Sequence, residues 1–146
     1  MMESLYKIEV KVFTEYVESQ SLPSEGKYFF SYTVKIKNIG KIPAKLISRH
    51  WIITDANERK EEVRGLGVVG EQPRLKTNES FEYTSGTIIN TPVGTMYGTY
   101  QMIADNGYEF DAEISFFFKC PESLKLICLH LLLGTFKVVT KNSEIY

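Results

Sequence analysis

YEFDAEISFFFK, residues 108–119, places an apolar side chain at every even position from Tyr108 to Phe118. A period of two is typical of a β-strand with one buried face. Thr95–Ala104 also reads as a strand, and Asp105-Asn106-Gly107 lies between the two segments. Because these turn residues tolerate positive φ, the sequence predicts a β-hairpin with a tight primed turn.

The same alternation recurs toward the N-terminus. It is clearest in Tyr28–Ile36, where the even positions are apolar, and it is also present from Tyr6 to Val12. Further strands are expected over residues 44–54, 59–64 and 81–89, with a small-residue break at 85–86. In the strand from Ala44 to Thr54, one predicted face carries Ile47, Trp51 and Ile53, and the other carries Leu46, His50 and Ile52.

About seven strands separated by turn signals, without helical periodicity before residue 120, predict an all-β chain. We expect an antiparallel, immunoglobulin/fibronectin-III-like β-sandwich. Trp51 suits such a core, and the fibronectin type is favoured because the matching disulfide is absent. Residues 1–120 are predicted to form the domain. Residues 121–146 form a C-terminal extension. Its apolar run, Leu126–Leu133, suits either a helix or a buried strand, and residues 136–140 read as another short strand.

Composition excludes several function classes. The 146 residues include 17 basic and 18 acidic side chains, so a net charge of −1 offers no general attraction for nucleic acid. The longest apolar run, Leu126–Leu133, is far shorter than the roughly 20 residues that cross a bilayer, so no membrane span is expected. Cys120 and Cys128 are expected to be reduced thiols of a cytoplasmic protein.

Residues 65–70, GLGVVG, match the G-x-G-x-x-G pattern of dinucleotide-binding loops. That loop works because a helix begins directly after it, whereas Pro73 and a polar segment follow here. We therefore expect the glycines to permit bulges or positive φ between strands. A looser alternative remains, in which backbone amides of this loop hold a phosphate or carboxylate. Its candidate ligand- or partner-binding residues are Arg64, Gly65, Gly67, Gly70 and Arg74.

Arg49, His50 and Trp51 form the second notable group. Neighbours on a strand point to opposite faces, so Arg49 and His50 are not expected to act on one substrate. With two histidines and two cysteines dispersed along the chain, no metal site is expected. No nucleophile elbow, P-loop lysine or H-E-x-x-H motif is present, so neither catalytic residues nor a cofactor are predicted.

Aromatic side chains also fall on the predicted outer faces, at Phe29, Tyr97 and Phe117. Exposed aromatics there would form a surface for a partner protein or a second copy of the chain. The alternative is that loops or the C-terminal extension cover them.

Four blocks resemble the ApaG (CorD) domain family: SRHWIITD at 48–55, EVRGLGVVGEQP at 62–73, YTSG at 83–86 and TPVGTMYGTY at 91–100. The resemblance covers roughly residues 5–118 and implies a fibronectin-III-like sandwich. Its family-motif positions here are Arg49, His50 and Trp51, with Gly65, Gly67 and Gly70 in the glycine motif. Bacterial members are associated with cobalt and magnesium resistance or efflux, and eukaryotic members use the domain in protein interaction.

The resemblance therefore implies a cytoplasmic, non-enzymatic interaction domain that acts in Co²⁺/Mg²⁺ homeostasis through an unidentified protein partner. The alternative is a small-ligand binder that holds a phosphate-bearing molecule, such as a nucleotide, or another anion at the glycine-rich loop. Residues 114–119 depart from the closing strand that family members usually have, and the extension after them leaves oligomeric state open.

Overall fold

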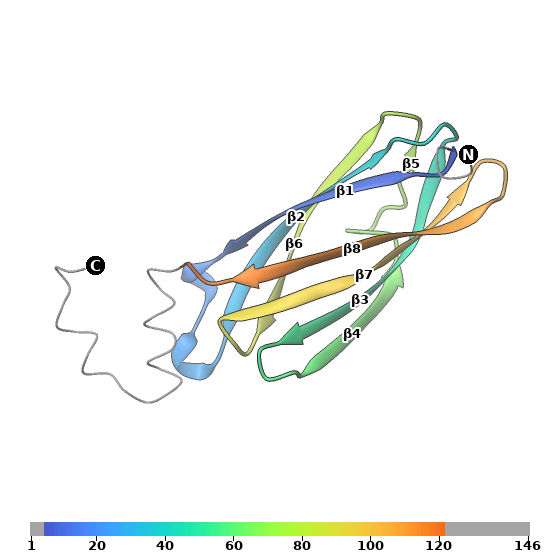
Figure 1. Ribbon diagram of the computed structural model, residues 1–146. Coiled ribbons are helices and arrows are strands. Elements are labelled where there is room, and N and C mark those ends of the chain that lie inside the picture. Colours follow the sequence, from blue (N-terminus) through green and yellow to red (C-terminus); the bar gives the residue numbers. More distant parts are fainter. Residues whose placement is uncertain (1–4, 122–146) are drawn as a thin grey trace.

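The computed structural model describes residues 5–121, which form two antiparallel sheets packed face to face (Figure 1). The first sheet has the order β1-β2-β6 and the second the order β4-β3-β7-β8, with β5 paired to β3 beyond the end of β4. The strands are β1 (Ile8–Tyr16), β2 (Tyr28–Asn38), β3 (Ala44–Asp55), β4 (Lys60–Leu66), β5 (Arg74–Leu75), β6 (Ser80–Ile89), β7 (Val93–Ala104) and β8 (Glu109–Lys119). Two short 3₁₀ turns, η1 (Glu18–Gln20) and η2 (Pro23–Glu25), join β1 to β2. The predicted antiparallel β-sandwich is confirmed.

The core lies between the sheets, where alternate side chains of each strand meet. Every even position of β2 from Tyr28 to Asn38 is buried, and β8 follows the predicted alternation with Ala112, Ile114 and Phe118 buried. Trp51 stands at the centre and meets Tyr100 edge-on, with 5.5 Å between ring centroids. Aromatic pairs prefer this arrangement, so the lone tryptophan is a core residue as predicted.

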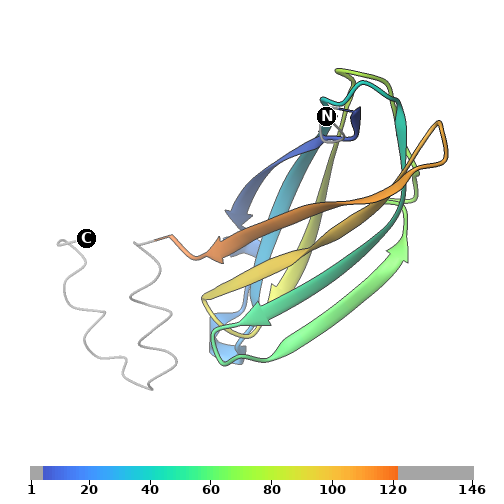
Figure 2. The same cartoon turned by 45° about the vertical axis from the view of Figure 1, so that its right-hand side comes forward.

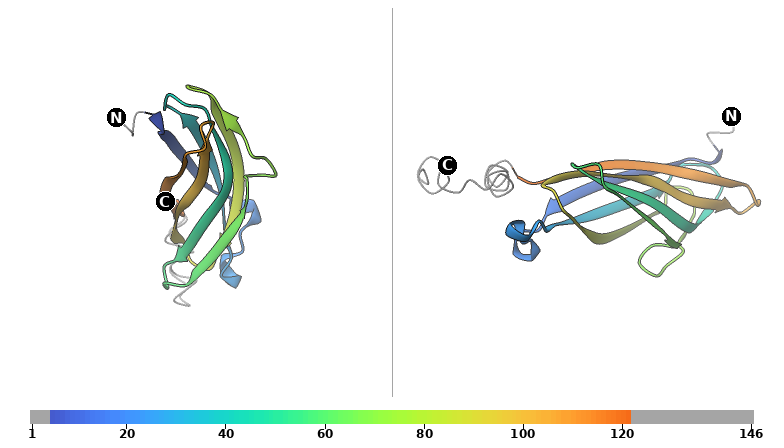
Figure 3. Two further views of the ribbon diagram at one scale, coloured as in Figure 1. Left: turned by 90° about the vertical axis from the view of Figure 1, so that its right-hand side faces the viewer. Right: turned by 90° about the horizontal axis from the view of Figure 1, so that it is seen from below.

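The two sides of the sandwich differ. β1 and β8 lie beside each other and close one side (Figure 2). On the other side β6 and β4 end their sheets, as the end-on view in Figure 3 shows. The segment after β4 stands away from the two layers there (Figure 3, right). The loop that contains the glycine motif therefore lies on this second side of the sandwich.

The face assignment predicted for the start of β3 is wrong. The register between β3 and β7 shifts between Leu46 and Ser48, which is a β-bulge. The extra residue reverses the parity, so Leu46 is fully buried on the same side as Trp51, while Ile47 leaves the core face. Strict alternation of buried and exposed residues does not predict these faces, because a bulge adds one residue to the strand and no residue type in the sequence marks it.

Two further sequence predictions are also wrong: the type of the β7–β8 turn and a break in β6. Positive φ in the β7–β8 turn is confined to Gly107, whose N–H donates to the Ala104 carbonyl (2.8 Å). The turn is therefore an unprimed one followed by a left-handed glycine, the usual geometry of a three-residue hairpin loop. The expected break in β6 is absent. Gly86 stays paired with Ser31, and the ring of Phe29 covers the space that a Cβ atom on Gly86 would need.

Asn38 joins three segments at the end of β2. Its buried side-chain amide donates to the carbonyls of Ile42 (3.0 Å) and Leu75 (2.9 Å) and accepts from the N–H of Gly40 (2.8 Å). These bonds fix the β2–β3 turn and hold β5 in place.

Replacing Asn38 by aspartate, which cannot donate to the two carbonyls, is expected to destabilise the fold. A buried group left without its partner costs about 1–3 kcal/mol, and we expect a loss of at least about 2 kcal/mol. Urea unfolding measures it. The exposed Asn57→Ala is the control, expected to change stability by less than about 0.5 kcal/mol. Equal losses in the two variants would contradict this role of Asn38.

Candidate functional site

The two family blocks of the sequence meet side by side in the fold. Gly65, expected in a loop, lies in β4 and pairs with Arg49 of β3. The Arg49 Nη1 donates to the carbonyls of Leu66 (3.1 Å) and Gly67 (2.7 Å). A Cβ atom on Gly65 would lie 2.9 Å from that Nη1, so a side chain at this position would displace the guanidinium from where it lies. The missing side chain of Gly65, the first glycine of the motif, thus leaves the space that the Arg49 guanidinium occupies.

Beyond Gly65 the chain forms a tight loop. Gly67, Val69 and Gly70 have φ of 59°, 43° and 80°. The N–H groups of Val68 and Glu71 each donate to the other residue's carbonyl (2.8 and 2.9 Å). The prediction of positive φ is confirmed at Gly67 and Gly70, and the loop leads into β5 rather than a helix.

The β3 bulge anchors this loop. The Ile47 carbonyl, turned out of the ladder, accepts from the Gly67 N–H (2.8 Å) and from the Gln72 Nε2 (2.8 Å). The Leu46 N–H donates to the Pro73 carbonyl (2.9 Å). Bulge and loop are thus one unit, and the N–H groups of Gly67, Val68 and Glu71 are used inside it.

The two arginines that flank the loop have separate carboxylate partners. Arg64 lies opposite His50 in the ladder, with its Nε 3.3 Å from an oxygen of Glu62. Arg74 lies opposite Lys45 and forms a two-point pair with Asp105 of the β7–β8 turn. Hydrogen bonding from Arg74 lowers the pKa of Asp105. An anion at the loop would compete with both carboxylates.

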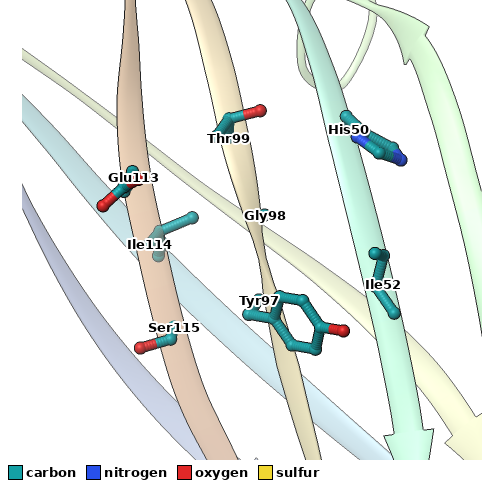
Figure 4. A pocket seen from close by; sticks show the side chains of 8 residues that line it. All are labelled: His50, Ile52, Tyr97, Gly98, Thr99, Glu113, Ile114 and Ser115. Atoms are coloured by element: carbon teal, nitrogen blue, oxygen red, sulfur yellow. The ribbon is translucent and has the colours of Figure 1, made fainter.

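His50 faces away from the core, opposite to Arg49 as predicted. Its Nε2 lies 3.3 Å from the Glu62 carboxylate, and this contact is the main cause of the lowered pKa of Glu62, ahead of Arg64. Beside it a shallow cavity of about 470 Å³ runs across β3, β7 and β8 (Figure 4). His50 and Ile52 lie on one side of this cavity, and Glu113 and Ser115 on the other (Figure 4).

These polar groups do not converge on one point. Within residues 5–121 no three histidine, cysteine, aspartate or glutamate side chains are grouped so that they could hold a metal ion. Cys120 is buried after β8, whereas Cys128 lies outside the described residues.

A second cavity, which the sequence did not reveal, opens between β4 and β6 and measures about 370 Å³. Trp51 and Arg49 line it, and Val68 and Val69 of the glycine loop border it. Its β6 wall carries Ser85, Gly86 and Thr87. Small side chains at the inward positions 85 and 87 leave this space, and they are the signal that could have indicated it.

Tyr83 also lines this cavity, and its hydroxyl lies 2.6 Å from that of Tyr100, joining the two sheets. Burial raises the pKa of Tyr83 to about 12, against a hydrogen bond from Tyr100 and the charge of Arg49, which act the other way. The pKa of Tyr100 is also raised, first by burial and then by Tyr83.

Apolar side chains are exposed on and near the loop. Leu66 is 75% exposed and Val69 54% exposed. Of the aromatic residues predicted to face outward, Phe117 (74%) and Tyr97 (38%) are exposed, whereas Phe29 is half-buried. The loop therefore presents apolar surface beside internally bonded amides.

Gly67 and Gly70 allow a matched test of the loop. A Cβ atom at Gly67 would lie 2.1 Å from the Glu71 carbonyl oxygen, whereas at Gly70 nothing lies within 4 Å. We expect Gly67→Ala to cost more than about 3 kcal/mol, and Gly70→Ala about 1–2 kcal/mol from backbone strain alone. Chemical unfolding of both variants measures the difference. Similar costs would mean that crowding at Gly67 does not matter.

The tyrosine pair predicts the alkaline behaviour of the fold. Because the folded pKa of Tyr83 is raised from its usual value near 10 to about 12, its stabilising contribution is complete below pH 10 and is lost toward pH 12. Among nine tyrosines, absorbance titration should therefore show a late step near pH 12, coincident with unfolding. Tyr83→Phe should reduce its amplitude. Ionisation of all tyrosines near pH 10 in an intact fold would contradict this.

Comparisons with known proteins agree with this geometry. A family model described as the ApaG domain matches residues 18–104. The chain is 54% identical to protein ApaG of Dechloromonas aromatica over 82% of its length and 94% of that protein. It is 57% identical to protein ApaG of Thiobacillus denitrificans over 75% of its length and 86% of that protein.

A crystal structure of the ApaA protein from Bordetella pertussis has the same fold. It superimposes with a TM-score of 0.80 at 52% identity, covering 82% of this chain and 98% of that one. In addition, no helix within residues 5–121 is long and apolar enough to cross a membrane. The domain model and the relatives together show that the chain belongs to the ApaG domain family.

Proposed function

We propose that this chain is a non-enzymatic, cytoplasmic interaction domain that acts in Co²⁺/Mg²⁺ homeostasis by binding a protein partner. The observation that carries the proposal is the surface of the glycine loop. Leu66 and Val69 are exposed there, while the N–H groups of Gly67, Val68 and Glu71 are bonded within the loop unit. Exposed apolar side chains on a rigid loop suit contact with another protein.

The rigidity of the loop supports the same proposal. Arg49, the β3 bulge and the Val68–Glu71 bridge hold the loop in one shape, so a partner would meet a preformed surface. Preorganised surfaces lose less conformational entropy on binding. Capture of a phosphate or nucleotide is the weaker alternative, because Arg64 and Arg74 already have carboxylate partners.

Partner capture from a lysate of the source organism tests the proposal. The wild-type chain is expected to retain a specific protein, and a Leu66→Ser/Val69→Ser variant should lose at least about tenfold of it through the lost apolar contact. Phe13→Ser on β1, which alters a side chain that is 65% exposed, is the control and should bind as the wild type does. Capture with residues 1–120 alone measures what the C-terminal extension adds.

Sensitivity to Co²⁺ is measured in a strain that lacks the gene. We expect complementation by the wild type and the Phe13→Ser variant, and failure by the loop variant. Calorimetry with Co²⁺ should show no saturable uptake, and uptake that disappears in His50→Ala would instead indicate direct metal binding. Saturable shifts of the Gly65–Gly70 amides with pyrophosphate would favour the ligand alternative.

A further inference from the structure

We propose that the open edge of β6 accepts an extended segment of the partner protein as an additional strand, with one large apolar side chain inserted into the cavity between β6 and β4. This inference rests on the proposed interaction function and names its surface. Strand addition is a common mode of peptide recognition, in which main-chain hydrogen bonds provide affinity and side-chain pockets provide specificity.

The hydrogen-bond pattern identifies the groups on this edge. The Asn38 N–H donates to the Glu79 carbonyl (3.0 Å), which places the odd residues of β6 in hydrogen-bonded pairs with β2. Since such pairs alternate in an antiparallel ladder, residues 82, 84, 86 and 88 direct their N–H and C=O groups away from β2. No strand within residues 5–121 pairs with this side of β6.

The edge of β6 lacks the features that normally block strand addition. Charged side chains, prolines and short length protect edge strands. The neighbouring edge, β4, is protected because five residues, 60–64, include four charged ones. In contrast, the seven residues Tyr83–Ile89 of β6 contain no charge and no proline, and Ile88 is 49% exposed. Of the two edges on this side of the sandwich, β6 is the one open to pairing.

The cavity lies along this unprotected stretch. Tyr83, Ser85, Gly86 and Thr87 form its β6 wall, and Trp51 also lines it. Its volume of about 370 Å³ is near the lower end of the range for ligand pockets, which suits one or two side chains rather than a large cofactor. A strand added to β6 would place alternate side chains over this opening.

Charge and shape select the occupant. One residue of each sign, Arg49 and Glu61, lines the cavity, so its lining carries no net charge and favours a neutral side chain. In a second copy pairing through its own β6, the large inward residues Phe81, Tyr83 and Ile89 are already packed in that copy's core. Its remaining inward residues, Ser85 and Thr87, are too small to fill the space. The fitting segment is therefore uncharged, rich in β-branched residues and carries one aromatic or large aliphatic side chain.

Selection from a phage-displayed library of random 12-residue peptides tests the inference. Selected peptides should share the alternating, uncharged pattern with one large apolar residue. Ile88→Pro removes one N–H from the open edge and no bond to β2, and it should weaken binding of a selected peptide about tenfold. The matched Ile88→Ala keeps this N–H and should retain most of the affinity. Ser85→Phe, which fills the cavity from within, should abolish binding while thermal unfolding shows an intact fold.

Selection of no peptide, or selected peptides that bind Ile88→Pro and Ser85→Phe as tightly as the wild type, would overturn the inference. Concentration-dependent dimerisation that Ile88→Pro abolishes would also overturn it, by assigning the edge to a second copy. Partner capture tests the proposed function separately. Suppose a captured partner binds Ile88→Pro and Ser85→Phe as the wild type but does not bind the Leu66→Ser/Val69→Ser variant. That result would support the proposed function and exclude the β6 edge as its binding surface.

Discussion

The guanidinium of Arg49 is the contact on which the open side of this sandwich depends. By donating to the Leu66 and Gly67 carbonyls, it fixes the point at which β4 ends and the loop begins. The charged hydrogen bonds are stronger than neutral ones. The guanidinium that makes them lies 2.9 Å from where a Cβ atom on Gly65 would be. Arg49 and the glycine motif are thus one structural device, although Gly65 follows Arg49 by 16 positions in the chain.

The bulge in β3 completes this device from the other strand. It releases the Ile47 carbonyl from the ladder, and the loop uses it for two hydrogen bonds. β3 can therefore pair with β4 along most of its length and with β5 at its start. The chain between β4 and β5 leaves the sheet. There it exposes Val69 and borders the cavity between β4 and β6.

The G-x-G-x-x-G motif has a different structural role in this chain from its role in a nucleotide-binding fold. In those folds, the loop amides and the following helix face a phosphate. In this chain three of the loop's N–H groups bond to its own carbonyls or to the bulge, and a two-residue strand follows. The apolar loop surface and the open edge of β6 are therefore the surfaces to which we assign binding, rather than an anion site at the loop.

The sequence by itself determined the sandwich, because alternation in 28–36 and 108–118 fixes which side chains face the core. It also indicated that Arg49 and His50 point apart, and that the glycines adopt positive φ, as they do at Gly67 and Gly70. Only the tertiary structure decided the β3 bulge, the place of Arg49 against Gly65 and the cavity beside β6. These features arise from contacts between residues far apart in the chain, and no local period encodes such contacts.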